Sequence, residues 1–315
     1  MENKAKQSEL LFIWDARMCN PNGDMSADNS PRFDEVDEKA IVSDVRVKRT
    51  IRDDLQYRKD EKLIFINNDE ILSSGLTAED RFVQIKNKFK EEKLDDLGVF
   101  LKCIDNRIFG GVAPKSGIQL IGTVQFGWTK SLNKTETILK SGTGAFATKA
   151  KDETPENKGE KERYQKTFRA DNYIPYGLFG MYGTVNRIQA EKAKTSESDI
   201  LSMIDSLWMG TKFLNTRSKE GQKPRLLLRV IYKESSKYFI GLLDELVGLK
   251  NSDSSMIREI QDADLDFSRL IKILNKAENE IEEVVIILDE SMEKYRDVLN
   301  KITKVKFTEE LEIMK

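Results

Sequence analysis

Residues 9–18 read ELLFIWDARM, and the organisation of the chain can be worked out from this stretch. Residues 10–14 are five consecutive apolar residues, several of them strong strand formers. A short apolar run of this kind is typical of a strand that is buried on both faces. An acidic residue follows the run at once, which argues against a signal peptide. We therefore expect the central strand of a sheet here.

A long loop and a helix follow this strand. Residues 19–42 (CNPNGDMSADNSPRFDEVDEKAIV) are dense in Asn, Asp, Gly and Pro, which predicts a loop of a length that is usually functional or disordered. Ser43 can cap the helix SDVRVKRTIRDDLQYR. On a helical wheel the apolar face is formed by Val47, Ile51 and Leu55. The adjacent face is basic and holds Lys48, Arg49 and Arg52, with Arg46 flanking it.

The remaining pattern predicts an α+β fold. We expect a short strand at 62–66, helices at 77–92 and 94–108, a strand at 117–128, an extended excursion at 140–169, a helix at 199–214 capped by Ser198 and a strand at 223–233. The end of the chain predicts a helix at 267–278, a strand at 283–288 and a helix at 291–301. Without the insertions the order is β-α-β-β-α-β, which is a ferredoxin-like or RNA-recognition-type core.

Composition excludes several kinds of chemistry. The 315 residues include no histidine, so a Ser-His-Asp triad, a Cys-His pair and a histidine-ligated metal are impossible. Cys19 and Cys103 are far apart, without the spacing of a zinc or redox pair, and we expect two reduced structural thiols. No apolar run is long enough to span a bilayer. We expect a cytoplasmic protein with no membrane partner, no cofactor and no bound metal.

Charge is distributed unevenly along the chain. The net charge is −2, but residues 251–315 carry 10 Lys/Arg against 16 Asp/Glu, and the other residues carry 42 against 38. Residues 127–170 alone carry 10 Lys/Arg against 6 Asp/Glu. A local basic surface matters more for phosphate binding than the overall sum. The basic helix face could grip a phosphate backbone, or it could be a solvated face paired with Asp44, Asp53 or Asp54; the pattern alone leaves both open.

Three further segments are candidates for binding. In the Asn/Asp loop, Asp24, Asp28, Asp34 and Asp37 could hold magnesium, but the spacing is not that of an EF-hand, and we favour turns and RNA contacts. The glycine pair at 110–111 could let the backbone approach a phosphate. Residues 215–219 (NTRSK) form a basic loop that is either functional or merely connecting.

Five segments in the right order carry a resemblance to a known family. They are NPNGDMSADNSPR at 20–32, VSDVRVKRTIRDDL at 42–55, FGGV at 109–112, TVQFGWTKSL at 123–132 and YIPYGLFGMYGTVN at 173–186. The chain resembles the Cascade backbone subunit of type I CRISPR systems, in the RAMP superfamily, and is most like the subtype I-B form. The resemblance covers most of residues 9–233, and the stretch after about residue 249 matches poorly.

The resemblance implies a single palm domain over residues 1–315 that is built on an RNA-recognition-type core. A β-hairpin thumb would lie at about 139–169 and a C-terminal extension at about 250–315. Copies of the subunit would line up along a CRISPR guide RNA, together with other Cascade subunits, and display the guide for pairing with target DNA. The subunit would bind without cutting. The residues expected to contact RNA are Asn20, Asn22, Arg46, Lys48, Arg49, Arg52, Gly110, Gly111, Arg217 and Lys219.

Two rival hypotheses stay open at this point. Backbone subunits of type III complexes look similar and cleave target RNA with an aspartate in the loop after the first strand, where Asp24, Asp28 or Asp34 could stand. The chain would then be a magnesium-dependent ribonuclease. A host RNA-binding protein unrelated to defence would instead bind RNA as a monomer.

Overall fold

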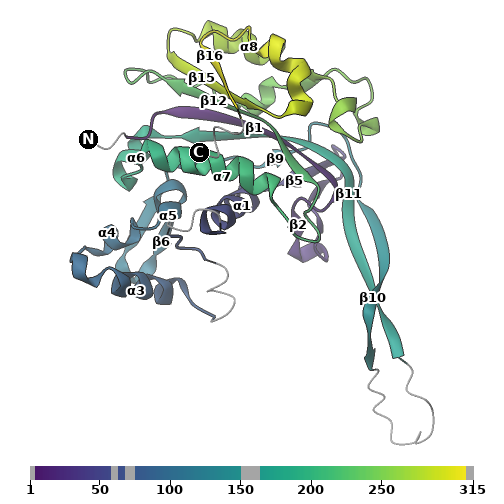
Figure 1. The fold of residues 1–315 in the computed structure, drawn as a ribbon, viewed down its shortest axis with the longest axis horizontal. Coiled ribbons are helices and arrows are strands. Elements are labelled where there is room, and N and C mark those ends of the chain that lie inside the picture. Colours follow the sequence, from purple (N-terminus) through teal and green to yellow (C-terminus); the bar gives the residue numbers. More distant parts are fainter. Residues whose placement is uncertain (1–3, 58–62, 68–74, 150–163, 310–315) are drawn as a thin grey trace, which may run out of the picture.

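The computed structural model describes residues 4–57, 63–67, 75–149 and 164–309. A twisted sheet crosses the molecule, with helices on one face and the C-terminal segment on the other (Figure 1). In the described part its strand order is β10-β11-β1-β12-β15-β16, and β8 pairs with β11. These strands are β1 (Ser8–Cys19), β8 (Val124–Phe126), β10 (Ile138–Lys149), β11 (Tyr164–Val185), β12 (Gln222–Tyr232), β15 (Ile281–Leu288) and β16 (Val305–Thr308).

Strand β1 occupies the centre of this sheet. It pairs antiparallel with β11 on one side and with β12 on the other. Side chains alternate along a strand, so Phe12 and Trp14 point to the helical face while Leu11 and Ile13 point to the opposite face. All four are almost completely buried. The prediction of a central strand buried on both faces is confirmed.

Two helices cover the first face. Helix α1 (Asp44–Tyr57) packs Val47, Ile51 and Leu55 into the core, as predicted. Helix α7 (Glu197–Lys212) crosses beside it. The predicted cap of α7 at Ser198 is wrong: Ser196 is the cap, and its hydroxyl accepts a hydrogen bond from the Asp199 backbone N–H at 3.2 Å.

The C-terminal segment covers the second face of the sheet. Strand β15 pairs antiparallel with β12, and β16 runs parallel to β15. Helix α8 (Ser268–Lys276) and the short helix α9 (Arg296–Leu299) lie over this face. Leu11 and Leu228 of the sheet share a hydrophobic cluster with Phe267 and Leu270. The second face is therefore a protein core and not a solvent-exposed platform.

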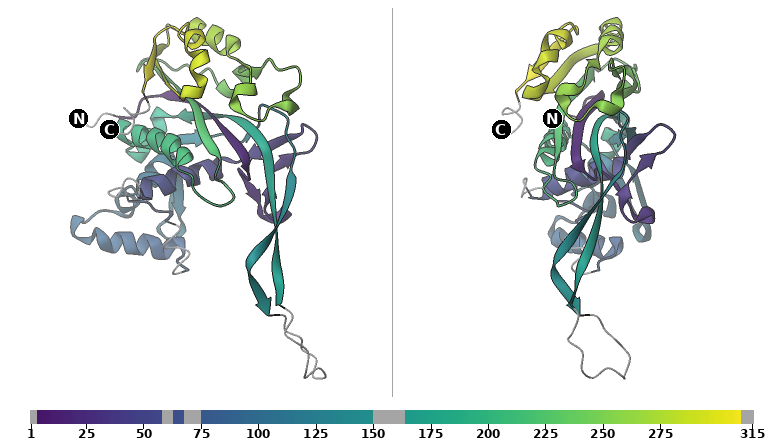
Figure 2. Two further views of the ribbon diagram at one scale, coloured as in Figure 1. Left: turned by 45° about the vertical axis from the view of Figure 1, so that its right-hand side comes forward. Right: turned by 90° about the vertical axis from the view of Figure 1, so that its right-hand side faces the viewer.

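A long two-stranded hairpin projects from the body of the molecule (Figures 1 and 2). It consists of β10 and the first part of β11, which pair from Ile138 opposite Tyr173 to Lys149 opposite Tyr164, with a shift of register between Thr143 and Ala147. Twelve residues in extended conformation span roughly 40 Å. Strand β11 then continues into the sheet, so the hairpin is anchored to the core through an unbroken strand.

A small lobe is inserted between α1 and β8. It contains α3 (Ala78–Lys88), α4 (Asp96–Phe100), α5 (Ile104–Phe109), β6 (Gly110–Ala113) and β7 (Ile118–Ile121). The single helix predicted over 94–108 is wrong. The helix breaks because side chains take its carbonyls: Asn106 donates to the Phe100 carbonyl at 2.9 Å and Arg107 to the Leu101 carbonyl at 2.8 Å.

Other predicted elements also differ from the structure. Residues 63–66 form no strand, and residue 62 lies outside the described part. The strand predicted over 117–128 divides into β7 and β8 at Gly122, where a Cβ would lie 2.1 Å from the Phe109 carbonyl carbon. The helix predicted over 291–301 is a 3₁₀ segment, Glu290–Tyr295, followed by α9. The strands at 223–233 and 283–288 and the helix at 267–278 are confirmed within one or two residues.

Candidate nucleic-acid interface

The basic residues of α1 lie on two different sides of the helix. Lys48 and Arg52 point toward α5, and both approach the Phe109 ring, at 5.8 and 5.0 Å from its centre. Arg46 interacts electrostatically with Lys219 in the loop after α7, which places it at another side. The alternative of a wholly solvated basic face does not hold for Arg52, because helix packing buries this side chain.

Arg52 is part of a buried ion pair. Its Nε lies 3.0 Å from a carboxylate oxygen of Asp105, which is fully buried. The same carboxylate accepts hydrogen bonds from the backbone N–H groups of Phe65 and Ile66, at 2.7 and 3.2 Å. Arg52 thus ties α1 to the inserted lobe. A contact between Arg52 and RNA stays a prediction. The burial of Arg52 argues against this contact.

Lys48 and Arg49 form ion pairs along the helix. Lys48 Nζ lies 2.9 Å from Asp44, and an Arg49 guanidinium nitrogen lies 2.7 Å from Asp53. Asp44 and Asp53, which the sequence offered as possible partners of the basic face, therefore do pair with it. Pairs at this spacing are worth little in solvent and can rearrange when a phosphate approaches.

Arg46 and Lys219 are two neighbouring cations. The opposite charge near Arg46, the Asp53 carboxylate, is already paired with Arg49. The two cations come from the start of α1 and the loop after α7, and neither makes an ion pair within the described part of the chain. Lys219 Nζ donates to the Asn20 carbonyl at 3.1 Å. Burial lowers the pKa of Arg46 to about 10, and burial with the nearby Arg46 charge lowers the pKa of Lys219 to about 8. An anion placed between them would relieve both effects.

The end of β1 forms the floor of this site. The thiol of Cys19 is buried, which raises its pKa to about 12, so it is neutral and offers no counter-charge. The Asn20 N–H donates to the Ser218 carbonyl at 2.7 Å, which holds the loop after α7 against the strand. The side-chain oxygen of Asn20 is buried and has no hydrogen-bond partner among the described residues.

Asn22 has a structural task. Its side-chain oxygen accepts hydrogen bonds from both the backbone N–H and the hydroxyl of Ser43, each at 2.8 Å. This contact fastens the Asn/Asp loop to the residue before α1. For the predicted contact with RNA, only the side-chain NH₂ group of Asn22 remains. This group already donates to the Gly23 carbonyl at 3.2 Å.

The base of the hairpin adjoins the same site. Arg217 is exposed and pairs with Asp171 of β11 at 3.1 Å. Asn172, the next residue, donates to the Ser30 hydroxyl in the Asn/Asp loop at 2.8 Å. The strand β1, the helix α1, the loop after α7 and the hairpin base therefore meet at one junction, which we call the basic junction.

The structure separates Gly110 and Gly111 from the basic junction. They lie in β6 of the inserted lobe, where a Cβ on Gly110 would meet the Leu120 carbonyl oxygen at 2.3 Å and one on Gly111 would meet the Phe100 ring at 3.1 Å. Close packing against β7 and α4 explains both glycines. The contact of this pair with phosphate stays a prediction.

Sequence reasoning missed a cation–π contact at the edge of the Asn/Asp loop. The Arg32 guanidinium lies 5.8 Å from the centre of the Trp128 ring, and Trp128 is 60% exposed. The strand expected over residues 117–128 includes Trp128, although β8 ends at Phe126. The neighbouring glycine and threonine in the quoted TVQFGWT stretch were the available signal that the strand ends there.

The loop aspartates are engaged by cations and backbone. Asp24 pairs with Arg32 at 3.1 Å, and Asp34 pairs with Lys130 at 2.6 Å. Among the described residues, no group of three or more acidic or cysteine side chains could hold a metal ion. No helix in the same part of the chain is long and apolar enough to cross a membrane.

Residues 6–268 match the family model described as CRISPR-associated protein Cas7. The chain belongs to this family. A relative named CRISPR-associated protein Cas7, from Haloferax volcanii, is 32% identical over 313 residues, which cover 91% of this chain and 88% of that protein. The resemblance found in the sequence is confirmed at the level of the Cas7 family.

Chains in two solved structures share the Cas7 fold seen here. One comes from a structure described as "CRISPR RNA-guided surveillance complex, pre-nicking", with a TM-score of 0.56 and 14% identity over 98% of both chains. The other comes from a "CRISPR RNA-guided surveillance complex", with a TM-score of 0.51 and 13% identity over 98% of this chain and 97% of that one. The likeness in fold includes the C-terminal segment, although the Cas7 family model ends at residue 268.

Proposed function

We propose that this Cas7 protein is a backbone subunit that binds the guide RNA of a type I CRISPR interference complex, most like subtype I-B. Copies of the chain polymerise along the guide, other Cascade subunits complete the assembly, and target DNA is reached by pairing with the guide. Family membership supports the general role. The type, the subtype and the RNA contacts rest on the sequence motifs and on the basic junction.

The strand order supports an RNA-recognition-type core. Taking β1, α1, β8, β11, α7 and β12 in turn gives β-α-β-β-α-β, with β12, β1, β11 and β8 adjacent in the sheet and antiparallel. Domains of this type often bind bases on the open sheet face. That face is filled here by the C-terminal segment, so the guide would follow the edge of the palm instead.

The Arg46–Lys219 pair is the observation that carries the proposal. Two half-buried cations that make no ion pair of their own among the described residues, with the nearby Asp53 held by Arg49, are costly unless an anion joins them. Asn20 adds a buried oxygen with no partner, which could accept a hydrogen bond from a ribose hydroxyl. A phosphate with its ribose suits this combination of groups.

The hairpin supports assembly along RNA. It projects from the palm and starts at the basic junction, where Asp171 meets Arg217. A thumb at about residues 139–169 would extend over the guide toward the next copy of the chain. Residues 150–163 at its tip lie outside the described part.

Binding without catalysis is part of the proposal. The alternative, a metal-dependent ribonuclease of the type III kind, would use Asp24, Asp28 or Asp34. Two of these carboxylates already hold cationic side chains of this chain. Replacing all three with Ala should leave assembly on the guide intact, and RNA incubated with magnesium should be cut by neither protein; cleavage by the wild type alone would favour the nuclease.

The experiment compares wild type with Arg46→Gln/Lys219→Gln for binding to a CRISPR repeat-spacer RNA across a salt series. We expect the variant to lose affinity at least tenfold. The slope of log affinity against log salt should fall by about 1.4, since each phosphate contact on a single strand contributes about 0.7.

A matched control is Lys90→Gln/Lys93→Gln, which removes the same charge from exposed positions in the inserted lobe. Its affinity and slope should stay close to wild type. Equal losses in both variants would mean that RNA responds only to net charge, and the basic junction would not be the guide site.

A further inference from the structure

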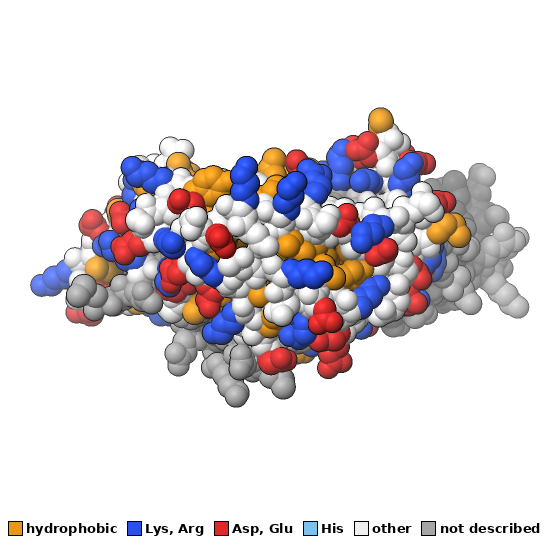
Figure 3. Space-filling model, turned by 90° about the horizontal axis from the view of Figure 1, so that it is seen from above, with side chains coloured by type: hydrophobic (Ala, Val, Ile, Leu, Met, Phe, Trp, Pro, Cys, Tyr) orange, Lys and Arg blue, Asp and Glu red, His pale blue; other side chains and the backbone are white. Residues whose placement is uncertain are grey.

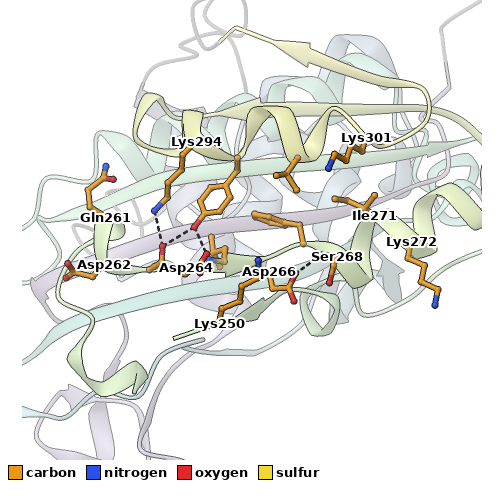
Figure 4. A pocket seen from close by; sticks show the side chains of 15 residues that line it. Lys250, Gln261, Asp262, Asp264, Asp266, Ser268, Ile271, Lys272, Lys294 and Lys301 are labelled. Carbon is orange, nitrogen blue, oxygen red and sulfur yellow. Dashed lines mark hydrogen bonds between the residues drawn. The ribbon is translucent and has the colours of Figure 1, made fainter. Parts of the chain in front are cut away.

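A pocket opens in the C-terminal segment, between α8, α9 and β14 (Leu265–Asp266) (Figure 4). Its floor is apolar and includes Phe267, Ile271 and Val298. Tyr295 closes one end, where its hydroxyl donates to the Ala263 carbonyl at 3.0 Å and accepts from the Leu265 N–H at 2.8 Å. These bonds satisfy the polar group of the wall and leave the floor apolar.

Four lysines surround this floor: Lys250, Lys272, Lys294 and Lys301. Lys294 is engaged, since it donates to the Ala263 carbonyl at 3.1 Å. The side chains of the other three make no ion pair and no hydrogen bond within the part of the chain that the structure describes. Lys272 and Lys301 lie in residues 251–315, whose net charge is −6, and Lys250 lies just before this range, near Asp266.

The acidic residues of the pocket are mostly committed to the backbone. The Asp262 carboxylate accepts from the N–H groups of Arg258 and Glu259, at 2.9 and 3.1 Å. The Asp266 carboxylate accepts from the Ser268 N–H at 3.0 Å at the start of α8, which lowers its pKa. Within the described part of the chain, neither aspartate forms an ion pair with Lys272 or Lys301.

We infer that this pocket docks an acidic peptide segment of another subunit, with an apolar side chain on the floor and carboxylates at Lys272 and Lys301. The inference rests on the proposed assembly, because it needs a partner subunit. Lys272 and Lys301 lie beyond residue 268, outside the family match, whereas Lys250 and the residues from Gln261 to Ser268 lie within it. Figure 3 shows the side of the molecule formed by this segment, where apolar side chains are exposed among Lys and Arg side chains.

Charge and shape favour a peptide over a nucleic acid. A phosphodiester chain needs a continuous positive track, which Asp262, Asp264 and Asp266 interrupt, whereas a peptide can place its few carboxylates at the lysines alone. The apolar floor offers nothing to a phosphate but would bury a Leu or Phe side chain. Free lysines on one wall provide the complementary partner for a peptide carboxylate.

The test is carbodiimide cross-linking of the complex purified through a tag on this chain. The reagent joins a lysine amine to a carboxylate only at contact distance. We expect mass spectrometry to map links from Lys272 or Lys301 to Asp or Glu of another subunit. Lys272→Arg/Lys301→Arg keeps the charge, so this variant should retain the partner and lose these links.

Charge reversal then tests the binding itself. Lys272→Glu/Lys301→Glu should reduce that partner in the purified complex at least tenfold, while Lys276→Glu, on the same helix but outside the pocket, should not. Links between two copies of this chain, or ultraviolet cross-links from the pocket to RNA, would overturn the inference. So would an intact complex without pocket links. A chain that purifies with no partner and no RNA would instead contradict the proposed function.

Discussion

Lys219 lies half-buried beside Arg46, and its pKa is lowered to about 8, mainly by burial. A phosphate bound there would stabilise the protonated amine and raise this pKa again. RNA binding must then take up a proton above pH 8, so affinity should fall by up to about tenfold between pH 7 and pH 9. Fluorescence anisotropy with a guide RNA at constant ionic strength measures this dependence.

The control is Lys219→Arg, which stays charged over the whole range. It should bind RNA with a nearly flat profile between pH 7 and pH 9. A fall of the same size in both proteins would mean that Lys219 is not the titrating group. In the free protein the sign is opposite: the lowered pKa makes stability rise from pH 8 toward 10.5, because the unfolded chain holds this proton more tightly.

The Arg52–Asp105 pair leads to a stability prediction. Removing the fully buried Asp105 leaves a buried guanidinium without a counter-ion and frees two backbone N–H groups. Asp105→Ala should therefore lower the free energy of unfolding by roughly 3–5 kcal/mol, measured by urea denaturation. Asp53→Ala breaks the more exposed pair with Arg49 and should cost less than about 1 kcal/mol. Similar losses in both variants would contradict this difference.

At the scale of elements, the N-terminus of α7 predicts different effects of replacing Ser196 and Ser198. The Ser196 hydroxyl accepts from the Asp199 N–H, and the Asp199 carboxylate accepts from the Ser196 N–H at 3.1 Å. Ser196→Ala should cost about 1 kcal/mol, whereas Ser198→Ala, at the exposed second position of the helix, should be close to neutral. Thermal unfolding of both variants measures this. A larger loss of stability in Ser198→Ala than in Ser196→Ala would mean that Ser198 is the cap, as predicted from the sequence.

Periodicity predicted the faces of α1 but not the burial or the partners of its Lys and Arg side chains. Val47, Ile51 and Leu55 follow the helical repeat, and burial follows from that repeat alone. Arg52 lies inside because Asp105, 53 residues away, was brought to it by the inserted lobe. Arg46 and Lys219 likewise meet only through the pairing of β1 with its neighbours. Contacts between distant segments leave no periodic signal in either segment.

At the scale of the whole molecule, the C-terminal segment limits where the proposed guide RNA could bind. Its sequence predicted a helix and a strand correctly, but not that they would seal the second face of the sheet. The run of apolar residues in β1 was the available signal, since a strand buried on both faces needs a cover on each side. With that face closed, the proposed route of the guide runs along the basic junction and the hairpin.

The hairpin gives the prediction that separates folding from assembly. Ser141 lies opposite Ala170, so an Asn-Gly turn joining these two residues would shorten the hairpin without shifting the register of β11. The sheet core of β11 begins near Ile174, beyond the deletion. The unfolding midpoint should therefore stay unchanged, and a short RNA that holds one subunit should bind with nearly wild-type affinity.

Binding to long RNA should change instead. If the hairpin bridges neighbouring copies, shortening it removes contacts that form only between adjacent subunits. The steep, cooperative coating of a repeat-spacer RNA should become shallow, and filaments seen by electron microscopy should disappear. Arg46→Gln/Lys219→Gln should weaken short and long RNA alike, because it removes contacts within one subunit. Cooperative coating by the shortened chain would show that the copies meet through the palm, and the hairpin would then serve another purpose.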